Sequence, residues 1–307
     1  GPSMHKAAPS DHRLARLASS SLFFPLLGAV LVVSWSSGFV GIRYATVEAS
    51  VFMVLFWRSL VSGALLLPFA LARGPRITLR ALAEQAAFAF LGMFLYLGGF
   101  ALAIGQRVPT GLVALMADLV PLAIAAMSLP ILGQRLTGRQ WLGTAIGLAG
   151  VLVVSADAFA LGDAPAMAYL LPVLGMISFA LATVLQGRRR SRELAIHQRL
   201  CLQCLFAAAF FAPCAVLYGG IVPPLTGSFA FGIGWLVFVA TYGAWITYYL
   251  CLRLYSPTRV SATIYLSPPV TMVWAWAMFG EPLTAAMALG LVVTLYGVWL
   301  VASVPRG

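Results

Sequence analysis

Two charged side chains, Arg58 and Asp118, lie deep inside long apolar stretches, seven residues past Val51 and nine residues past Pro109. An ionisable side chain inside a membrane-spanning helix is costly, so such a residue is a candidate for function by default. At 1.5 Å of rise per residue, the two positions lie about 10 and 14 Å from the same end of their helices, which allows them to pair. Both residues have two open roles, a structural ion pair or a substrate-binding group. Proton carriage is a further role for Asp118, and snorkelling toward the lipid headgroups is a further role for Arg58.

Prolines interrupt two of the apolar stretches, at Pro121 and at Pro268 and Pro269. Pro121 and Pro269 each remove a helix hydrogen bond and free the carbonyl four residues earlier, at Ala117 and Tyr265. Freed carbonyls inside a membrane are tolerated where they face protein or a wet cavity. The prolines are therefore candidate hinges, or their freed carbonyls bind a polar substrate. The alternative is a kink that serves packing alone.

Aromatic residues at mid-depth are candidates for the walls of a binding cavity. A cavity with aromatic walls and a few polar groups is typical of a small-molecule site. Tryptophan and tyrosine also gather at the two membrane interfaces, so packing or an interfacial position is the alternative for each of them. Together with the two charges, the candidate substrate-binding residues are Trp35, Arg58, Tyr96, Phe100, Asp118, Trp245, Tyr248 and Tyr265.

The sequence contains little that suits catalysis or metal binding. Cys201 and Cys204 have C-x-x-C spacing, but they lie in an apolar stretch without the strand of a redox motif. The three histidines, His5, His12 and His197, lie outside the deep parts of the spans, which leaves no base beside a nucleophile there. A carboxylate pair needs two acids and only one lies deep, and the sequence has no G-x-x-x-x-G-K-S/T loop for ATP. We therefore expect no enzyme activity, no metal and no cofactor.

Composition places the chain in a membrane. Apolar residues make up 62% of it and charged residues only 9%, against roughly 45–50% and 25% in soluble domains. Ten apolar runs approach the length of about 20 residues that a bilayer crossing needs. Backbone groups in lipid must be satisfied within their own segment, so these runs predict helices and an all-α membrane protein. The runs cover residues 22–42, 51–72, 81–104, 109–132, 138–155, 166–186, 198–218, 229–252, 257–279 and 284–303.

Basic residues gather in alternate gaps between these runs. One set of gaps holds sixteen of the 19 lysines and arginines, and the other set holds only Arg43 and Arg107. By the positive-inside rule the first set faces the cytoplasm, together with both termini, residues 1–21 and 304–307. The three residues ahead of Met4 have the form of a remnant of a cleaved tag. The basic residues form no stripe with stacking aromatics, so the net charge of +11 indicates membrane lipids as partners and no nucleic acid.

A long stretch of the chain occurs twice. Residues 109–150 and 257–297 each hold a Pro-Thr start, a proline inside a helix, a short Gly-containing crossing and a glycine-containing helix, at an offset of 147–148 residues. Such repeats mark related units, here two halves, 22–156 and 157–303, of five helices each. Because five is odd, the second half must enter the membrane from the opposite side. Inverted-topology repeats are the architecture of many secondary transporters, with the substrate near the midplane. A channel or a scaffold is the alternative from another class.

Motifs in both halves carry a family resemblance. They are Trp35–Phe39, Arg58, Asp118–Pro121, Leu132–Thr137, Trp141–Gly143, Ser267–Pro269 and Phe279–Thr284. These motifs resemble the EamA-type transporters of the drug/metabolite transporter superfamily, and the resemblance covers about residues 22–303. The chain departs from the family at Gln134, where a glutamate is usual, whereas Glu281 keeps the acid in the second half.

The resemblance implies a ten-helix transporter of the bacterial inner membrane, similar above all to the amino-acid exporters of the YddG type. It implies export of amino acids, aromatic and other apolar ones included, by alternating access through a central cavity between the first four helices of each half. Export or import of another metabolite or drug is the alternative. Gly143 and Gly147 predict close packing of the fifth helix, and in the resembled family the fifth and tenth helices pack or form a homodimer.

Overall fold

The computed structural model describes residues 9–19, 21–133, 135–189, 194–254 and 263–302, and within these ranges the regular secondary structure is helix alone. Two of its segments, η1 and η3, are π-helical, and η2 is a 3-10 helix. The elements are α1 (Pro9–Ala18), α2 (Phe23–Ala45), α3 (Val51–Ala72), α4 (Leu79–Ala89), η1 (Phe90–Leu95), α5 (Tyr96–Gly105), α6 (Thr110–Ala117), α7 (Val120–Leu132), α8 (Gly138–Leu161), η2 (Ala166–Tyr169), α9 (Leu170–Arg189), α10 (Ile196–Leu217), α11 (Gly227–Gly234), η3 (Trp235–Gly243), α12 (Ala244–Leu254), α14 (Ser267–Phe279) and α15 (Ala285–Ala302).

Among the described residues, seven helical stretches are long and apolar enough to cross a bilayer. They are Phe23–Ala45, Val51–Ala72, Leu79–Gly105, Gly138–Leu161, Ala166–Leu185, Ile196–Leu217 and Gly227–Tyr248, and two shorter apolar stretches, Thr110–Ile124 and Ala285–Val301, accompany them. The protein is therefore an all-helical, multi-pass membrane protein. The predicted run 257–279 begins outside the described residues, so ten crossings in two inverted repeats stay a prediction.

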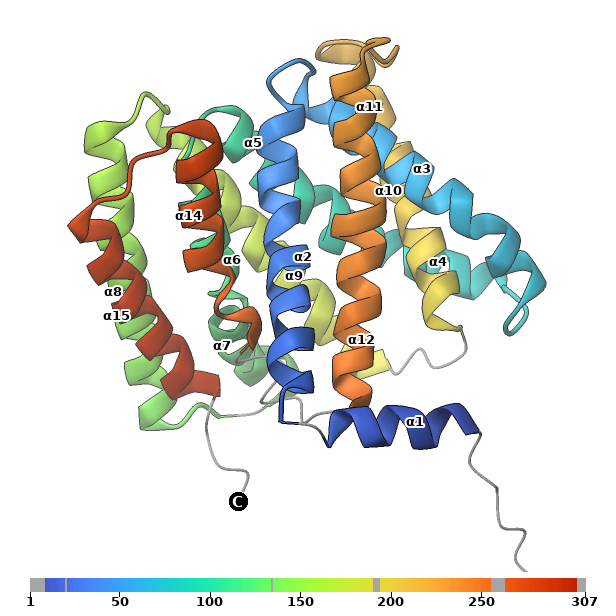
Figure 1. The fold of residues 1–307 in the computed structure, drawn as a ribbon, viewed down its shortest axis with the longest axis horizontal. Helices are drawn as coiled ribbons and strands as arrows, with labels where there is room; N and C mark the ends of the chain where they lie inside the picture. Colours follow the sequence, from blue (N-terminus) through green and yellow to red (C-terminus); the bar gives the residue numbers. More distant parts are fainter. Residues whose placement is uncertain (1–8, 20, 134, 190–193, 255–262, 303–307) are drawn as a thin grey trace, which may run out of the picture.

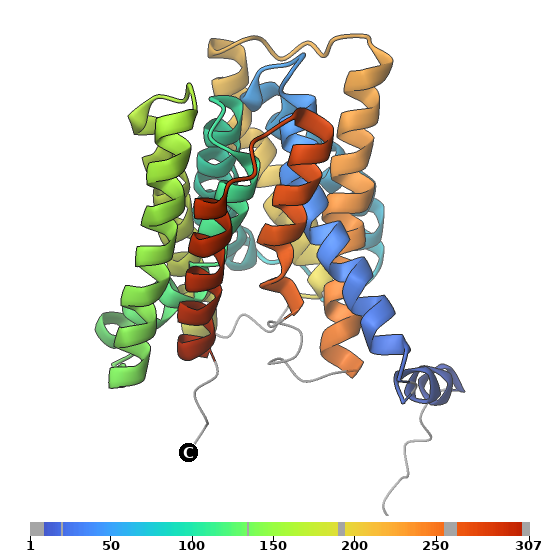
Figure 2. The same cartoon turned by 60° about the vertical axis from the view of Figure 1, so that its left-hand side comes forward.

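The helices form an upright bundle with α8 and α15 side by side on one flank (Figures 1 and 2). The connection between α2 and α3 and the one between α14 and α15 lie at the same end of the bundle, which we call the predicted outer end because Arg43 and Glu281 lie there. Helix α1 lies across the opposite end, at a steep angle to α2 (Figure 2). The basic residues of segment 1–21 predicted only a cytoplasmic tail, and the structure shows that this segment contains the helix α1.

The structure differs from the prediction that these prolines lie inside continuous helices, because both helices are interrupted just before them. A turn at Asp118 and Leu119 separates α6 from α7, and Pro121 lies in the first turn of α7. In the second half, α14 begins at Ser267 after a turn, and Pro268 and Pro269 fall in its first turn. Proline suits this place because a first-turn residue needs no backbone N–H, and its φ angle is already helical. The two turns occupy matching positions of the predicted repeat.

Helices α8 and α15 approach each other through small residues, which confirms the close packing predicted for Gly143 and Gly147. A Cβ atom placed on Gly297 would lie 2.3 Å from the backbone nitrogen of Gly147. A Cβ on Gly143 would lie 2.7 Å from the carbonyl oxygen of Gly297. Only glycine allows backbones this close. The interface also includes Thr294, whose hydroxyl donates to the carbonyls of Gly147 and Gly290.

Candidate functional site

A central cavity of about 160 Å³ lies between α2, α3, η1, α5, α9, α10 and the η3–α12 segment. Five of the eight predicted substrate-binding residues line it, namely Trp35, Arg58, Tyr96, Phe100 and Trp245. The other three, Asp118, Tyr248 and Tyr265, are not part of its wall. The cavity wall therefore contains Arg58 and most of the predicted aromatic side chains, but not Asp118.

Arg58 faces the cavity and has no acidic partner among the residues that the structure describes. Its Nε and Nη2 atoms both donate to the hydroxyl of Thr241, at 3.3 Å each. In the part of the chain that the structure describes, no carboxylate oxygen lies within ion-pair distance of it. A guanidinium has five N–H donors in a fixed fork, so most of this fork stays available for a ligand. This geometry suits a planar carboxylate.

Aromatic rings form the wall around this cation. The ring centroids of Trp35 and Trp245 are 6.4 Å apart in an edge-to-face arrangement, and Tyr248 packs against both rings from outside the cavity wall. On the other side of the cavity, the ring centroids of Tyr96 and Phe100 are 4.5 Å apart. Phe100 itself is 2% exposed, so it supports Tyr96 more than it offers surface to a ligand. The result is a small apolar chamber with one strong polar anchor.

Asp118 lies at the interruption between α6 and α7, with only 5% of its surface exposed. Its Oδ2 atom has no hydrogen-bond partner among the described residues. Helix α6 packs on α5, which contributes Tyr96 to the cavity wall, and on α14, which follows Tyr265. Arg58 bonds to Thr241 and makes no ion pair with Asp118 in this structure.

The π-helical segments were not predicted, and they supply cavity residues that sequence reasoning missed. Thr241, the hydroxyl partner of Arg58, lies in η3 and also donates to the carbonyl of Leu236, five residues earlier. Met93 comes from η1. Segments of π-helix occur frequently at functional sites because the wider turn redirects side chains. Their sequences are as apolar as the neighbouring α-helices, so hydropathy contains no signal for them.

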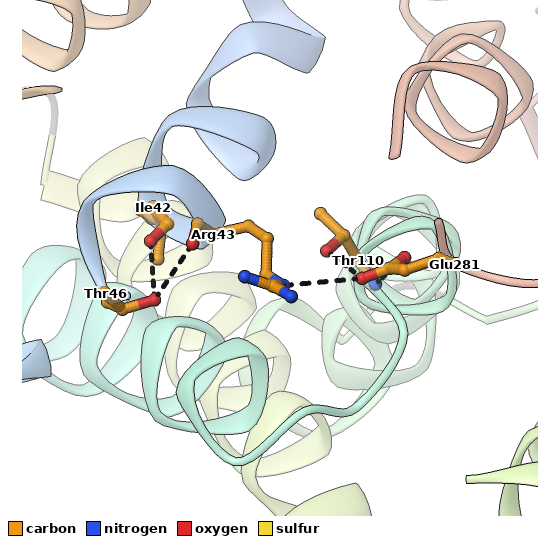
Figure 3. Close-up of polar contacts among 5 residues, drawn as sticks. All are labelled: Ile42, Arg43, Thr46, Thr110 and Glu281. Atoms are coloured by element: carbon orange, nitrogen blue, oxygen red, sulfur yellow. Dashed lines mark hydrogen bonds and ion pairs between the residues drawn. The ribbon is translucent and has the colours of Figure 1, made fainter. Parts of the chain in front are cut away.

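Polar contacts close the predicted outer end (Figure 3). The carboxylate of Glu281 accepts from the backbone nitrogen of Thr110 at 2.9 Å and from its hydroxyl at 2.8 Å. The Nε atom of Arg43 lies 3.8 Å from the same carboxylate, and its guanidinium lies 4.6 Å from the ring centroid of Phe279. One acid thus ties α2 and the start of α6 to the α14–α15 connection. The matching Gln134 lies outside the described residues.

A second and larger hollow, a groove of about 550 Å³, lies between α3, α10 and the η3–α12 segment. Its walls include exposed apolar side chains such as Phe69, Phe238 and Ile246. It shares Leu200 and Trp245 with the central cavity. The groove lacks a charged group to orient a polar substrate, so we take the smaller central cavity as the candidate site. The described residues contain no cluster of three or more metal-ligating side chains.

Known proteins resemble this chain over nearly its whole length. It is 29% identical over 283 residues to "Uncharacterized inner membrane transporter YedA" of Escherichia coli K12, covering 90% of both chains. It is 24% identical over 287 residues to "Uncharacterized transporter YvbV" of Bacillus subtilis, again covering 90% of both. A solved structure titled "Crystal structure of protein" shares the fold, with a TM-score of 0.63 and 22% identity over 90% of this chain and 94% of the other.

The profile of the EamA-like transporter family matches residues 22–156 and 166–303, which are nearly all of the membrane-spanning part. These matches, together with the apolar bundle and its central cavity, lead to one conclusion. The chain belongs to the EamA-like transporter family and is a membrane transporter.

Proposed function

We propose that the protein is a secondary transporter that binds a small zwitterion, an amino acid above all, in the central cavity and exports it by alternating access. The observation that carries the proposal is Arg58, a cation that faces the cavity and is bonded to a hydroxyl instead of a carboxylate. An arginine in the membrane interior without an acidic partner is expensive. A substrate carboxylate would supply the missing charge, with bidentate hydrogen bonds.

The cavity supports a small substrate with an apolar side chain. Its volume of about 160 Å³ is below the roughly 300–1,000 Å³ of pockets that hold drug-sized ligands. Trp35, Tyr96 and Trp245 offer aromatic faces for a side chain, and such faces also attract an ammonium group. Larger drugs and metabolites would need a wider cavity than this conformation has. An amino acid with an aromatic or aliphatic side chain therefore suits it best.

Two features support alternating access. Glu281 ties three elements at the predicted outer end, whereas the cavity extends to Leu200, near the start of α10 at the opposite end. This difference favours a conformation that is closed outside. The interruptions before Pro121 and Pro268 are places where backbone angles can change while the flanking helices stay rigid, as hinges require. Outward transport across a bacterial inner membrane, with both termini in the cytoplasm, completes the proposal on the strength of the family resemblance and the loop charges.

Counterflow in proteoliposomes tests this function. Vesicles loaded with one unlabelled amino acid should transiently accumulate the labelled compound from outside, because a carrier exchanges substrate across the membrane and a channel does not. Arg58→Gln removes hydrogen bonds from a charged donor, worth about 1.5–3 kcal/mol. We therefore expect the half-saturation concentration to rise about 10- to 150-fold. Arg58→Lys keeps the charge but loses the forked guanidinium. Its half-saturation concentration should lie between that of the unchanged protein and that of Arg58→Gln.

The matched control is Arg135→Gln, because Arg135 is exposed in the connection between α7 and α8. It should exchange amino acids like the unchanged protein. A thermal melt of each variant separates a binding defect from a folding defect. Absence of counterflow across a panel of amino acids, or an unchanged half-saturation concentration in Arg58→Gln, contradicts the proposal.

A further inference from the structure

Asp118 is the buried charge that the cavity does not use. It lies at the interruption between α6 and α7 with 5% of its surface exposed, about midway through the predicted fourth span. A buried carboxyl group normally has hydrogen-bond or ionic partners. Its Oδ2 atom has none among the described residues. A carboxylate in such surroundings would be isolated in a medium of low dielectric constant, and such groups become neutral instead.

The surroundings of Asp118 decide what neutralises it. Asp118 is buried and lines neither the central cavity nor the groove, so an organic ammonium group beside it would have to displace packed side chains. A metal cation prefers several oxygen ligands, and no acidic or other metal-ligating cluster surrounds the carboxyl in the described ranges. Arg58 bonds to Thr241 and makes no ion pair with Asp118. The one cation that needs neither space nor further ligands is a proton.

We propose that Asp118 takes up a proton in one conformation of the transport cycle and releases it in the other, so that transport is coupled to proton movement. This inference rests on the transporter function proposed above. The step is an acid–base equilibrium in which the carboxylate takes a proton from water on one side and becomes a neutral acid. Rearrangement at the interruption then exposes the acid to the other side, where the proton returns to water. No bond other than the O–H bond forms or breaks.

The position of Asp118 provides both of the parts that coupling needs. The interruption between α6 and α7 lies beside its counterpart in the second half, because α14 packs on α6. A movement of either helix start therefore changes the surroundings of this carboxyl. Helix α5, which contributes Tyr96 to the cavity wall beside Arg58, also packs on α6. A substrate on Arg58 that shifts α5 therefore acts on the helix that ends at Asp118, which links substrate binding to the protonation of this residue.

Other titratable groups near these helices are accounted for. Tyr96 lies on α5 and Tyr265 lies in the turn before α14, and both of these helices pack on α6. On α2, Arg43 lies at the outer end and faces Glu281. On α8, Asp157 also lies near the outer end, where it accepts from the hydroxyl of Thr284. Tyr169 lies just before α9, and Tyr296 lies on α15 with its side chain exposed. A pH response of transport would therefore be assigned to Asp118 first.

Proteoliposomes that contain a pH-sensitive dye test the coupling. After counterflow has identified an amino acid that the protein transports, a gradient of that amino acid should change the internal pH in proportion to the amino acid moved. Asp118→Asn, which keeps the shape and removes the titratable group, should abolish this pH change. Asp157→Asn is the matched acid-to-amide control and should keep the full ratio of protons to substrate. Counterflow without any pH change in the unchanged protein overturns the coupling and leaves the transporter function intact.

A second measurement does not depend on transport. Infrared difference spectra of the protein in lipid, recorded between high and low pH, should contain a carbonyl band of a buried protonated carboxyl group. That band should disappear in Asp118→Asn and persist in Asp157→Asn. If the band is the same in all three proteins, Asp118 does not bind the proton and the inference fails. Failure of counterflow with the band present would instead contradict the proposed function alone.

Discussion

The α8–α15 pair and the helices around the central cavity are built in opposite ways. In the pair, glycines bring the two backbones into contact along the interface, and Thr294 adds hydrogen bonds to the carbonyls of Gly147 and Gly290. Around the cavity, large aromatic side chains lie between the helices, and two spans contain π-helical segments. The neighbouring α6–α7 span, which packs on the cavity helices α2 and α5, is interrupted. Direct backbone contact fixes α8 and α15 in one relative position. Helices that touch through aromatic rings, or that are interrupted, can pack in several positions. The pair therefore suits a fixed support and the cavity helices suit movement.

Charge follows the same division. Arg58 lies in the cavity wall and Asp118 lies in the neighbouring α6–α7 span, and both belong to the first half. The predicted repeat places the uncharged Gln203 and Leu266 at their matching positions. Gln203 instead bonds to Gln85, with Nε2 donating to Oε1 at 2.8 Å. Glycines recur in both halves and pack together in the α8–α15 pair, whereas the two buried charges occur in the first half alone. A repeated backbone can thus hold a site that is asymmetric in charge.

The largest expected effect breaks the pair. Gly297→Ala adds a Cβ atom that would lie 2.3 Å from the backbone nitrogen of Gly147, so the helices must separate. Overpacking of this kind costs about 1–3 kcal/mol, and a clash with backbone lies at the upper end. Size-exclusion chromatography and thermal melts should show little folded protein. Gly234→Ala is the control, because its added Cβ meets nothing within 4 Å. Equal melts for the two variants would mean that the pair is no tighter than the cavity helices.

An intermediate effect on stability is expected when the contacts of Glu281 at the predicted outer end are removed. Glu281→Ala removes the acceptor that caps α6 through Thr110 and the partner of Arg43. Loss of a helix cap costs about 0.5–2 kcal/mol, so the melting temperature should fall measurably. Glu84→Ala is the control, because Glu84 pairs with Arg80, whose side chain is 87% exposed, and such surface pairs contribute about 0–1 kcal/mol. If both variants melt alike, Glu281 does not hold the outer end together.

The smallest expected effect on stability concerns the interrupted helix. Pro121 lies in the first turn of α7, where proline fits, so Pro121→Ala should change stability by less than about 1 kcal/mol. Pro68 lies inside α3, where proline costs up to about 3 kcal/mol, so Pro68→Ala should stabilise the protein clearly. Counterflow should slow more in Pro121→Ala than in Pro68→Ala, because only the former stiffens a proposed hinge. A large gain in stability from Pro121→Ala would favour a bent continuous helix instead.

The sequence by itself determined the properties that depend on neighbouring residues. Apolar runs of bilayer length place the helices, because burial in lipid is a property of each segment alone. The spacing of Gly143 and Gly147 predicts close packing, because side chains four residues apart share one helix face. Five cavity residues were found for a similar reason: a charge or an aromatic ring at mid-depth is visible in the sequence without knowledge of its partners.

Only the tertiary structure decided which of these side chains meet. Arg58 bonds to Thr241 across 183 residues, and Thr110 donates to Glu281 across 171. Such contacts depend on how helices pack and rotate, which hydropathy does not encode. A proline reveals a missing N–H group but not whether the helix bends or starts again, because tertiary contacts decide between the two. The absence of an Arg58–Asp118 ion pair, on which the proton proposal depends, has the same origin: equal depth in a membrane does not bring two side chains onto facing sides of their helices.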